Sequence, residues 1–162
     1  MRNTSLLRRA AALGCAALLT FGLAACGEKE ESQTETRLYR DGTYTAQFDT
    51  AGADGYTTYA VVEIASDKVS VTEFDGKNAS GELRSADTEL ADSMKEGASE
   101  YLTFEPTPAN LSRKAMEDFA AAGGDPDSMA LTAGGPEYGL ELAALVDAVL
   151  DGPAKADSES GS

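Results

Sequence analysis

The stretch from residue 130 to 139, ALTAGGPEYG, holds the residues whose types and spacing could do chemistry. Thr132 offers a hydroxyl, and Gly134 and Gly135 expose backbone N–H groups just before a predicted helix. Unpaired N–H groups and the helix dipole favour a phosphate at such a place. Glu137, at the same helix terminus, would compete with that anion. The stretch is therefore either an anion-binding element or a Gly-Gly-Pro turn in which Thr132 caps a peptide N–H.

The rest of the composition limits the catalytic alternatives. The chain has no histidine, so the commonest general base and metal ligand is missing, and a Ser-His or Cys-His triad is missing with it. Asp125 and Asp127 stand two residues apart, but the later ligands of a calcium loop do not follow, which favours a turn. We predict no catalytic residue and no metal site.

The first 25 residues have the pattern of a signal peptide. Three arginines precede an uncharged stretch from Ala10 to Ala25, which is shorter than the roughly 20 apolar residues of a membrane-spanning helix. The sequence Leu23-Ala24-Ala25-Cys26 resembles a bacterial lipobox, which implies cleavage before Cys26 and acylation of that cysteine. The alternative is ordinary cleavage that leaves a free thiol. Two or more acyl chains anchor a protein stably, so the bilayer is a predicted partner and the outer side of the cell membrane the predicted location.

The charge of the chain excludes another class of partner. Without the three arginines of the leader, 10 basic residues face 28 acidic ones, which gives a formal charge of −18. Such a surface repels nucleic acid. The charge indicates solubility outside the cell or a preference for cationic partners.

Between the termini we expect a single α+β domain over residues 39–152, after a flexible tether at 26–38 and before a disordered tail at 153–162. Apolar alternation predicts strands at 42–48, 56–64 and 69–74, with a register slip before Phe74 and a hairpin turn at residues 66–68. Helical spacing predicts helices at 87–95, from Thr107 to Gly123, and at 138–150. We therefore expect a small antiparallel sheet of N-terminal strands packed by three C-terminal helices. The predicted core comprises Val61, Val62, Ile64, Val71, Phe74, Leu111, Phe119, Leu142, Leu145 and Val146.

Two blocks of this domain resemble a known family. They are residues 39–45, YRDGTYT, and residues 77–85, KNASGELRS, followed by the predicted helix that runs to Lys95. Together with the order of elements they resemble the small FMN-binding-domain lipoproteins of bacteria, the group of the major membrane immunogen. In flavinylated members of that family, the hydroxyl of a Gly-Ala-Thr or Gly-Ala-Ser sequence before the last helix carries FMN through a phosphoester bond. The corresponding stretch here has Thr132 six residues before Tyr138, which is the family's spacing to an aromatic residue, and Leu131 where the family has a small residue.

The resemblance implies an electron-transfer or flavin-carrying module on the outer side of the membrane. Its cofactor would be FMN, bound covalently or non-covalently at Thr132, Gly134, Gly135 and Tyr138, and its partner would be a redox protein of the membrane. The alternative is a member that has lost its flavin and acts as a binding or structural lipoprotein.

Overall fold

The computed structural model describes residues 37–156. The predicted leader, the lipidated Cys26 and the tether up to residue 36 therefore lie outside the described residues.

The sheet has three antiparallel strands in the order β1 (Gly42–Gln47), β2 (Thr57–Ala65) and β3 (Lys68–Lys77). Ser66 and Asp67 form the two-residue turn between β2 and β3, and both have positive φ, at 51° and 60°. This is the backbone that matches the twist of a hairpin. Val61 pairs with Glu73 but Val62 pairs with Val71, so Thr72 is an extra, bulged residue. The hairpin and the register slip that the sequence predicted are confirmed.

The helices follow the strands. They are α2 (Thr88–Glu96), α3 (Pro108–Ala121) and α4 (Pro136–Asp151), with short 3-10 turns at Arg84–Ala86 and Pro126–Ser128. The predicted cap of α3 is confirmed, because the Thr107 hydroxyl accepts a hydrogen bond of 3.2 Å from the Asn110 N–H. The last helix begins two residues earlier than predicted, since Pro136 supplies a φ that suits the first turn. The α+β class with N-terminal strands and C-terminal helices is confirmed.

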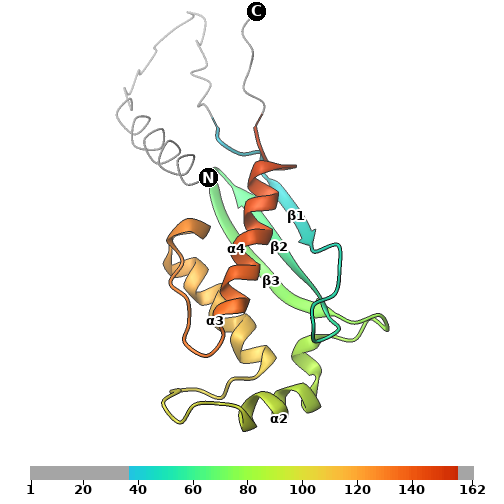
Figure 1. Cartoon of the computed structure of the whole chain (residues 1–162). Coiled ribbons are helices and arrows are strands. Elements are labelled where there is room, and N and C mark those ends of the chain that lie inside the picture. Colours follow the sequence, from blue (N-terminus) through green and yellow to red (C-terminus); the bar gives the residue numbers. More distant parts are fainter. Residues whose placement is uncertain (1–36, 157–162) are drawn as a thin grey trace, which may run out of the picture. The chain divides into compact units, whose positions relative to one another are not determined.

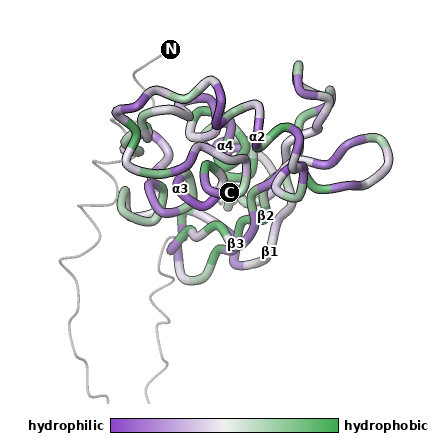
Figure 2. Tube along the Cα trace, turned by 90° about the horizontal axis from the view of Figure 1, so that it is seen from below, coloured by the Kyte–Doolittle hydropathy of each residue, from purple (hydrophilic) through white to green (hydrophobic). Residues whose placement is uncertain are grey.

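The core lies between α3, α4 and one face of the sheet (Figure 1). Hydrophobic stretches of the trace run along β2, β3 and α4, and hydrophilic ones mark the loops around them (Figure 2). Ten predicted core positions divide clearly: eight are buried, and Val61 and Val71 are half-buried. Val61 pairs with Thr45 of β1. Because side chains alternate between the faces of a sheet, the Val61 side chain lies on the face that the helices leave open. Its assignment to the core was wrong.

The two ends of the domain meet beside β1. Ala154 is fully buried and its carbonyl accepts the Arg40 N–H at 2.8 Å. The Ala156 N–H donates to the Leu38 carbonyl at 3.2 Å, and Tyr39 pairs with Lys155. The fold therefore extends beyond the predicted boundaries at residues 39 and 152, because a short strand-like pairing continues after α4. Among residues 37–156, no helix has both the length and the apolar character needed to cross a membrane.

Candidate functional site

The turn before α4 is held by its own backbone. Gly135 is the N-cap of α4, and its N–H donates to the Thr132 carbonyl at 3.3 Å. Gly134 has φ of 89°, and a Cβ there would lie 2.9 Å from a methyl carbon of Leu102. A Cβ at Gly135 would lie 2.3 Å from a methyl carbon of Leu111. Close packing against the buried Leu111 thus requires a glycine at Gly135, and the left-handed backbone favours one at Gly134.

The hydroxyl of Thr132 is directed at a neighbouring helix. It donates a hydrogen bond to the carboxylate of Asp118, which lies on α3, and the threonine is half-buried. This contact ties the turn to α3. The sequence did not indicate it, because the two residues lie 14 positions apart.

The Tyr138 side chain lies in the core of the domain and not at the surface near the turn. It is 7% exposed, its ring meets Phe74 edge-on at 6.3 Å between centroids, and the Arg84 guanidinium lies 4.4 Å from its ring centre. Burial raises the pKa of the Tyr138 phenol to about 12, against the opposite influence of the Arg84 charge. The phenol is therefore neutral at physiological pH, and the ring is a core group.

A polar cluster with a buried guanidinium and partly exposed carboxylates lies against that ring, and sequence reasoning missed it. Arg84 is 3% exposed, and its guanidinium contacts the carboxylates of Asp54 at 3.3 Å and Glu141 at 3.5 Å. The Thr58 hydroxyl donates to the same Glu141 carboxylate at 3.1 Å. The cluster joins β2, the loop before it, the segment after β3 and the first turns of α4. No local pattern reveals it, because its members are spread over residues 54–141.

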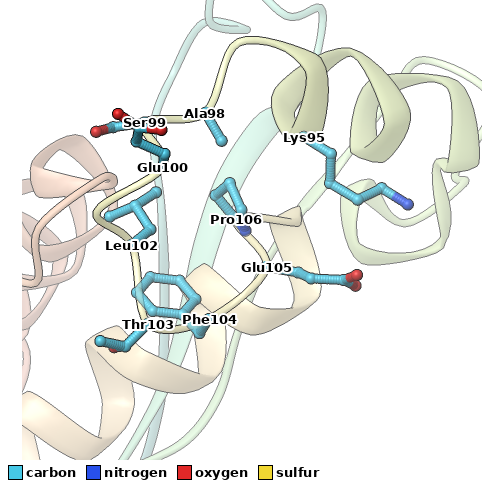
Figure 3. A pocket seen from close by; sticks show the side chains of 9 residues that line it. All are labelled: Lys95, Ala98, Ser99, Glu100, Leu102, Thr103, Phe104, Glu105 and Pro106. Carbon is cyan, nitrogen blue, oxygen red and sulfur yellow. The ribbon is translucent and has the colours of Figure 1, made fainter.

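A surface groove adjoins the turn. It is shallow and open to solvent, has a volume of about 440 Å³, and is formed by the end of α2 and the loop that follows (Figure 3). Leu102 belongs both to this groove and to the contact with Gly134, so the groove and the turn are neighbours. Lys95 and Glu105 extend to one side of the loop and Glu100 to the other. The residues around the groove are Lys95, Ala98, Ser99, Glu100, Leu102, Thr103, Phe104, Glu105 and Pro106.

These residues do not fit a phosphate at Thr132. A phosphoester on its oxygen would replace the hydroxyl proton that now satisfies Asp118, and would set the single negative charge of the resulting phosphodiester against that carboxylate. The Gly135 N–H, one of the two predicted phosphate donors, is already bonded to a carbonyl. The adjoining groove offers one lysine against two glutamates, and the lysine is paired with Asp92 at 2.8 Å. The structure thus brings Thr132, Gly134 and Gly135 together; the Tyr138 N–H donates to the Gly135 carbonyl at 3.2 Å, but the Tyr138 ring packs against Phe74 and Arg84 in the core.

Comparisons with known proteins give the fold alone. No protein-family model and no curated protein matches the chain. Among solved structures, the crystal structure of the CPE2226 protein from Clostridium perfringens has a TM-score of 0.57 at 17% identity, over 70% of this chain and 87% of that one. A solution NMR structure of a protein from Clostridium thermocellum has a TM-score of 0.46 at 18% identity, over 75% of this chain and 98% of that one. The first of these supports the α+β architecture and carries no argument about ligand or activity.

Proposed function

We propose that this chain is a lipid-anchored extracytoplasmic protein whose FMN-binding-type domain serves as a binding module without a flavin on Thr132. The observation that carries this proposal is the hydrogen bond from the Thr132 hydroxyl to the Asp118 carboxylate. A phosphoester at that oxygen meets like charge instead of a cation. The N-terminal pattern that ends in Leu23-Ala24-Ala25-Cys26 supports the anchoring part.

Within the described domain, the groove and the first described residues lie at opposite ends of α4. The described chain begins at Arg37, where Leu38 and Tyr39 pair with the segment after α4. The Thr132–Gly135 turn and its groove lie at the opposite end of α4, which has 16 residues and is about 24 Å long at 1.5 Å per residue. The groove is thus distant from Arg37, the first described residue of the domain. The groove's apolar side chains and excess of carboxylates suit an uncharged or cationic small molecule.

The anchoring part is tested by replacing the cysteine that would be acylated. Cys26→Ser should move the protein from the membrane fraction to the soluble fraction. Cys15→Ser is the matched control, because Cys15 lies within the predicted leader and should leave fractionation unchanged. A Cys26→Ser protein that stays with membranes after a high-salt wash would overturn the anchoring proposal.

A second function, the electron-transfer or flavin-carrying module, is favoured by a different observation. Thr132 is half-buried within reach of solvent, it stands six residues before Tyr138, and the turn after it leads directly into the N-terminus of α4. Helix N-termini favour phosphate. In that function the flavin supplies the redox chemistry, and the chain would provide position and electrostatics.

The visible spectrum and the mass of the protein isolated from its native host separate these functions. Our proposal expects a colourless protein that leaves the fluorescence of added FMN unquenched at micromolar concentration. Covalent FMN requires a yellow chromophore that persists in denaturant, is lost in Thr132→Ala and is kept in Thr103→Ala, a threonine of the groove. Non-covalent FMN requires a colour that washes away on unfolding. Either coloured result would contradict the binding-module proposal and support the flavin-carrying function.

A further inference from the structure

The two edges of the sheet differ in how they are protected. Within the described part of the chain, β3 has charged residues, the Thr72 bulge and covering segments. Gly124 comes so close that a Cβ there would lie 2.4 Å from the Val69 carbonyl oxygen, and Leu83 pairs with Lys77 at the other end of the strand. Charges, bulges and covering loops are the usual means of blocking a sheet edge. The edge of β3 is therefore closed to a further strand.

Within residues 37–156, the segment 154–156 pairs with residues 38–40, which precede β1, but no described segment pairs with the outer edge of β1 itself, and β1 has no bulge. Its six residues, GTYTAQ, include no charged residue and no proline, although a quarter of the chain is charged. It lies at the margin of the sheet away from β3 (Figure 1). An uncharged edge strand is a template for pairing.

The direction of the backbone groups of β1 follows from one hydrogen bond. The Phe48 N–H donates to the Thr58 carbonyl at 3.0 Å, so the even-numbered residues of β1 direct their N–H and C=O groups at β2. Alternation in an antiparallel ladder then directs the groups of Thr43, Thr45 and Gln47 away from the sheet. All three residues are exposed. Three alternate residues thus present donors and acceptors along one line.

The side chains of β1 specify what could pair there. Tyr44 and Ala46 are half-buried and pack against the core on the helix-covered face. Thr45 and Gln47 lie on the open face, where they help to line a polar hollow of about 340 Å³ with Tyr59, Glu73 and other strand residues. An added strand must therefore alternate apolar residues on the first face with uncharged polar residues on the second. β1 itself has this pattern.

We propose that β1 pairs antiparallel with β1 of a second copy of this chain, about a two-fold axis at Thr45. In this register Thr45 faces Thr45 of the second copy, and Thr43 faces Gln47 of the second copy on either side. All three outward-directed residues then form hydrogen-bonded pairs. Tyr44 faces Ala46 of the second copy on the apolar face, so both faces are matched. The product is a continuous six-stranded sheet with an isologous interface.

Charge at the ends of the new ladder predicts its salt dependence. Asp41 comes opposite Asp49 of the second copy at both ends, although Arg37 already pairs with Asp41 at 2.6 Å. The net charge of −15 adds a longer-range repulsion between copies. Both effects are screened within about 10 Å at 0.1 M salt. The dimer should therefore be weaker in dilute buffer and stronger in moderate salt.

Cross-linking of the full chain tests the contact. Cα atoms of a hydrogen-bonded antiparallel pair are about 5.5 Å apart, which lies within the range of a disulfide. Oxidation with copper phenanthroline should link Thr45→Cys into a covalent dimer on a non-reducing gel. Ser70→Cys, an exposed residue of β3, is the matched control, and the unaltered chain gives the background from Cys15 and Cys26. Equal cross-linking of Thr45→Cys and Ser70→Cys would overturn the proposal, and so would a Thr45→Cys link to a different protein.

Charge exchange at the axis gives an independent measurement. Thr45→Lys alone and Thr45→Glu alone each place two like charges face to face, so each should weaken the dimer by about tenfold or more in sedimentation velocity. An equimolar mixture of the two should recover the association, because lysine then faces glutamate. Ser70→Lys should leave the dimer unchanged. Single variants that associate like the parent, or a mixture that does not recover, would contradict pairing through Thr45.

Discussion

Two polar clusters lie on either side of the start of α4, and they differ in burial. Arg84 lies inside, against Tyr138, between the carboxylates of Asp54 and Glu141. Thr132 lies at the surface and bonds to Asp118 on α3. The inner cluster connects four segments around one buried guanidinium, and loss of Arg84 would leave two carboxylates without their cation. The outer contact fixes only a turn. The difference indicates that the first turns of α4 are held in place by buried contacts, and that the turn at residues 132–135 is held by fewer of them.

The largest effect on the free energy of unfolding should come from the buried apolar face of α4. The effects of the two polar clusters are compared with it. Leu145, on α4, is 2% exposed. Leu145→Ala should lower the free energy of unfolding by about 2–5 kcal/mol, through lost burial and the cavity left behind. Leu140→Ala on the outer face of the same helix, where the side chain is 57% exposed, should change it by less than about 0.5 kcal/mol. Chemical denaturation measures both, and equal losses would mean that α4 does not pack on the sheet as described.

The inner cluster should give the next largest effect. Arg84→Met keeps a long side chain but removes the charge that holds Asp54 and Glu141. We expect a loss of about 1.5–3 kcal/mol in the free energy of unfolding, typical of hydrogen bonds to charged groups. Arg113→Met removes an exposed ion pair with Glu117 on α3 and should cost at most about 1 kcal/mol. If both variants melt alike, the inner cluster has no greater role than a surface pair.

The outer contact should give a smaller effect. Thr132→Val preserves the shape of the side chain and removes the donor to Asp118, so the expected loss is about 0.5–1.5 kcal/mol. Thr103→Val, at an exposed threonine of the groove, is the control and should stay within about 0.5 kcal/mol. Thermal or urea denaturation decides. A loss as large as that of Arg84→Met would remove the distinction between the two clusters.

The sequence predicted the fold well because its signals are local. Apolar alternation located the strands, including the slip before Phe74, and helical spacing with the Thr107 cap located α3. The domain boundary at residue 152 was set too early, since Gly152 and Pro153 end a helix without ending a fold. Ala154 returns to the core by pairing with the segment before β1.

The site was less predictable because its contacts are distant in sequence. The turn at residues 132–135 was located correctly, but its partner Asp118 is 14 positions away. Tyr138 was grouped with the turn on spacing alone, whereas the helix rotates it inward to Phe74 and Arg84. Arg84 itself lies in residues 77–85, which the sequence analysis used only for the resemblance to the FMN-binding-domain lipoproteins. Burial of a charge depends on several segments at once, and no local pattern records it.

A third polar contact, at the cap of α2, should give the smallest effect and a defined pH dependence. The Asp87 carboxylate accepts hydrogen bonds from the Leu90 N–H at 2.9 Å and from the Tyr56 hydroxyl at 2.7 Å. These bonds, the Leu90 contact foremost, hold the pKa of Asp87 below its ordinary value of 3.8. A carboxyl whose folded pKa is depressed stabilises the fold above the unfolded pKa, and this contribution is lost as the pH falls through the folded pKa.

Asp87→Asn keeps a capping oxygen but cannot titrate. The difference between urea midpoints at pH 7 and pH 3 should therefore be smaller in Asp87→Asn than in the parent. Asp41 and Glu117, whose carboxyl pKa values are also lowered, contribute equally to both proteins and cancel in that comparison. Ser93→Ala, at an exposed residue of the same helix that does not titrate, is the control and should keep the difference of the parent. An unchanged pH dependence in Asp87→Asn would show that this cap is as weakly coupled to folding as an exposed surface pair.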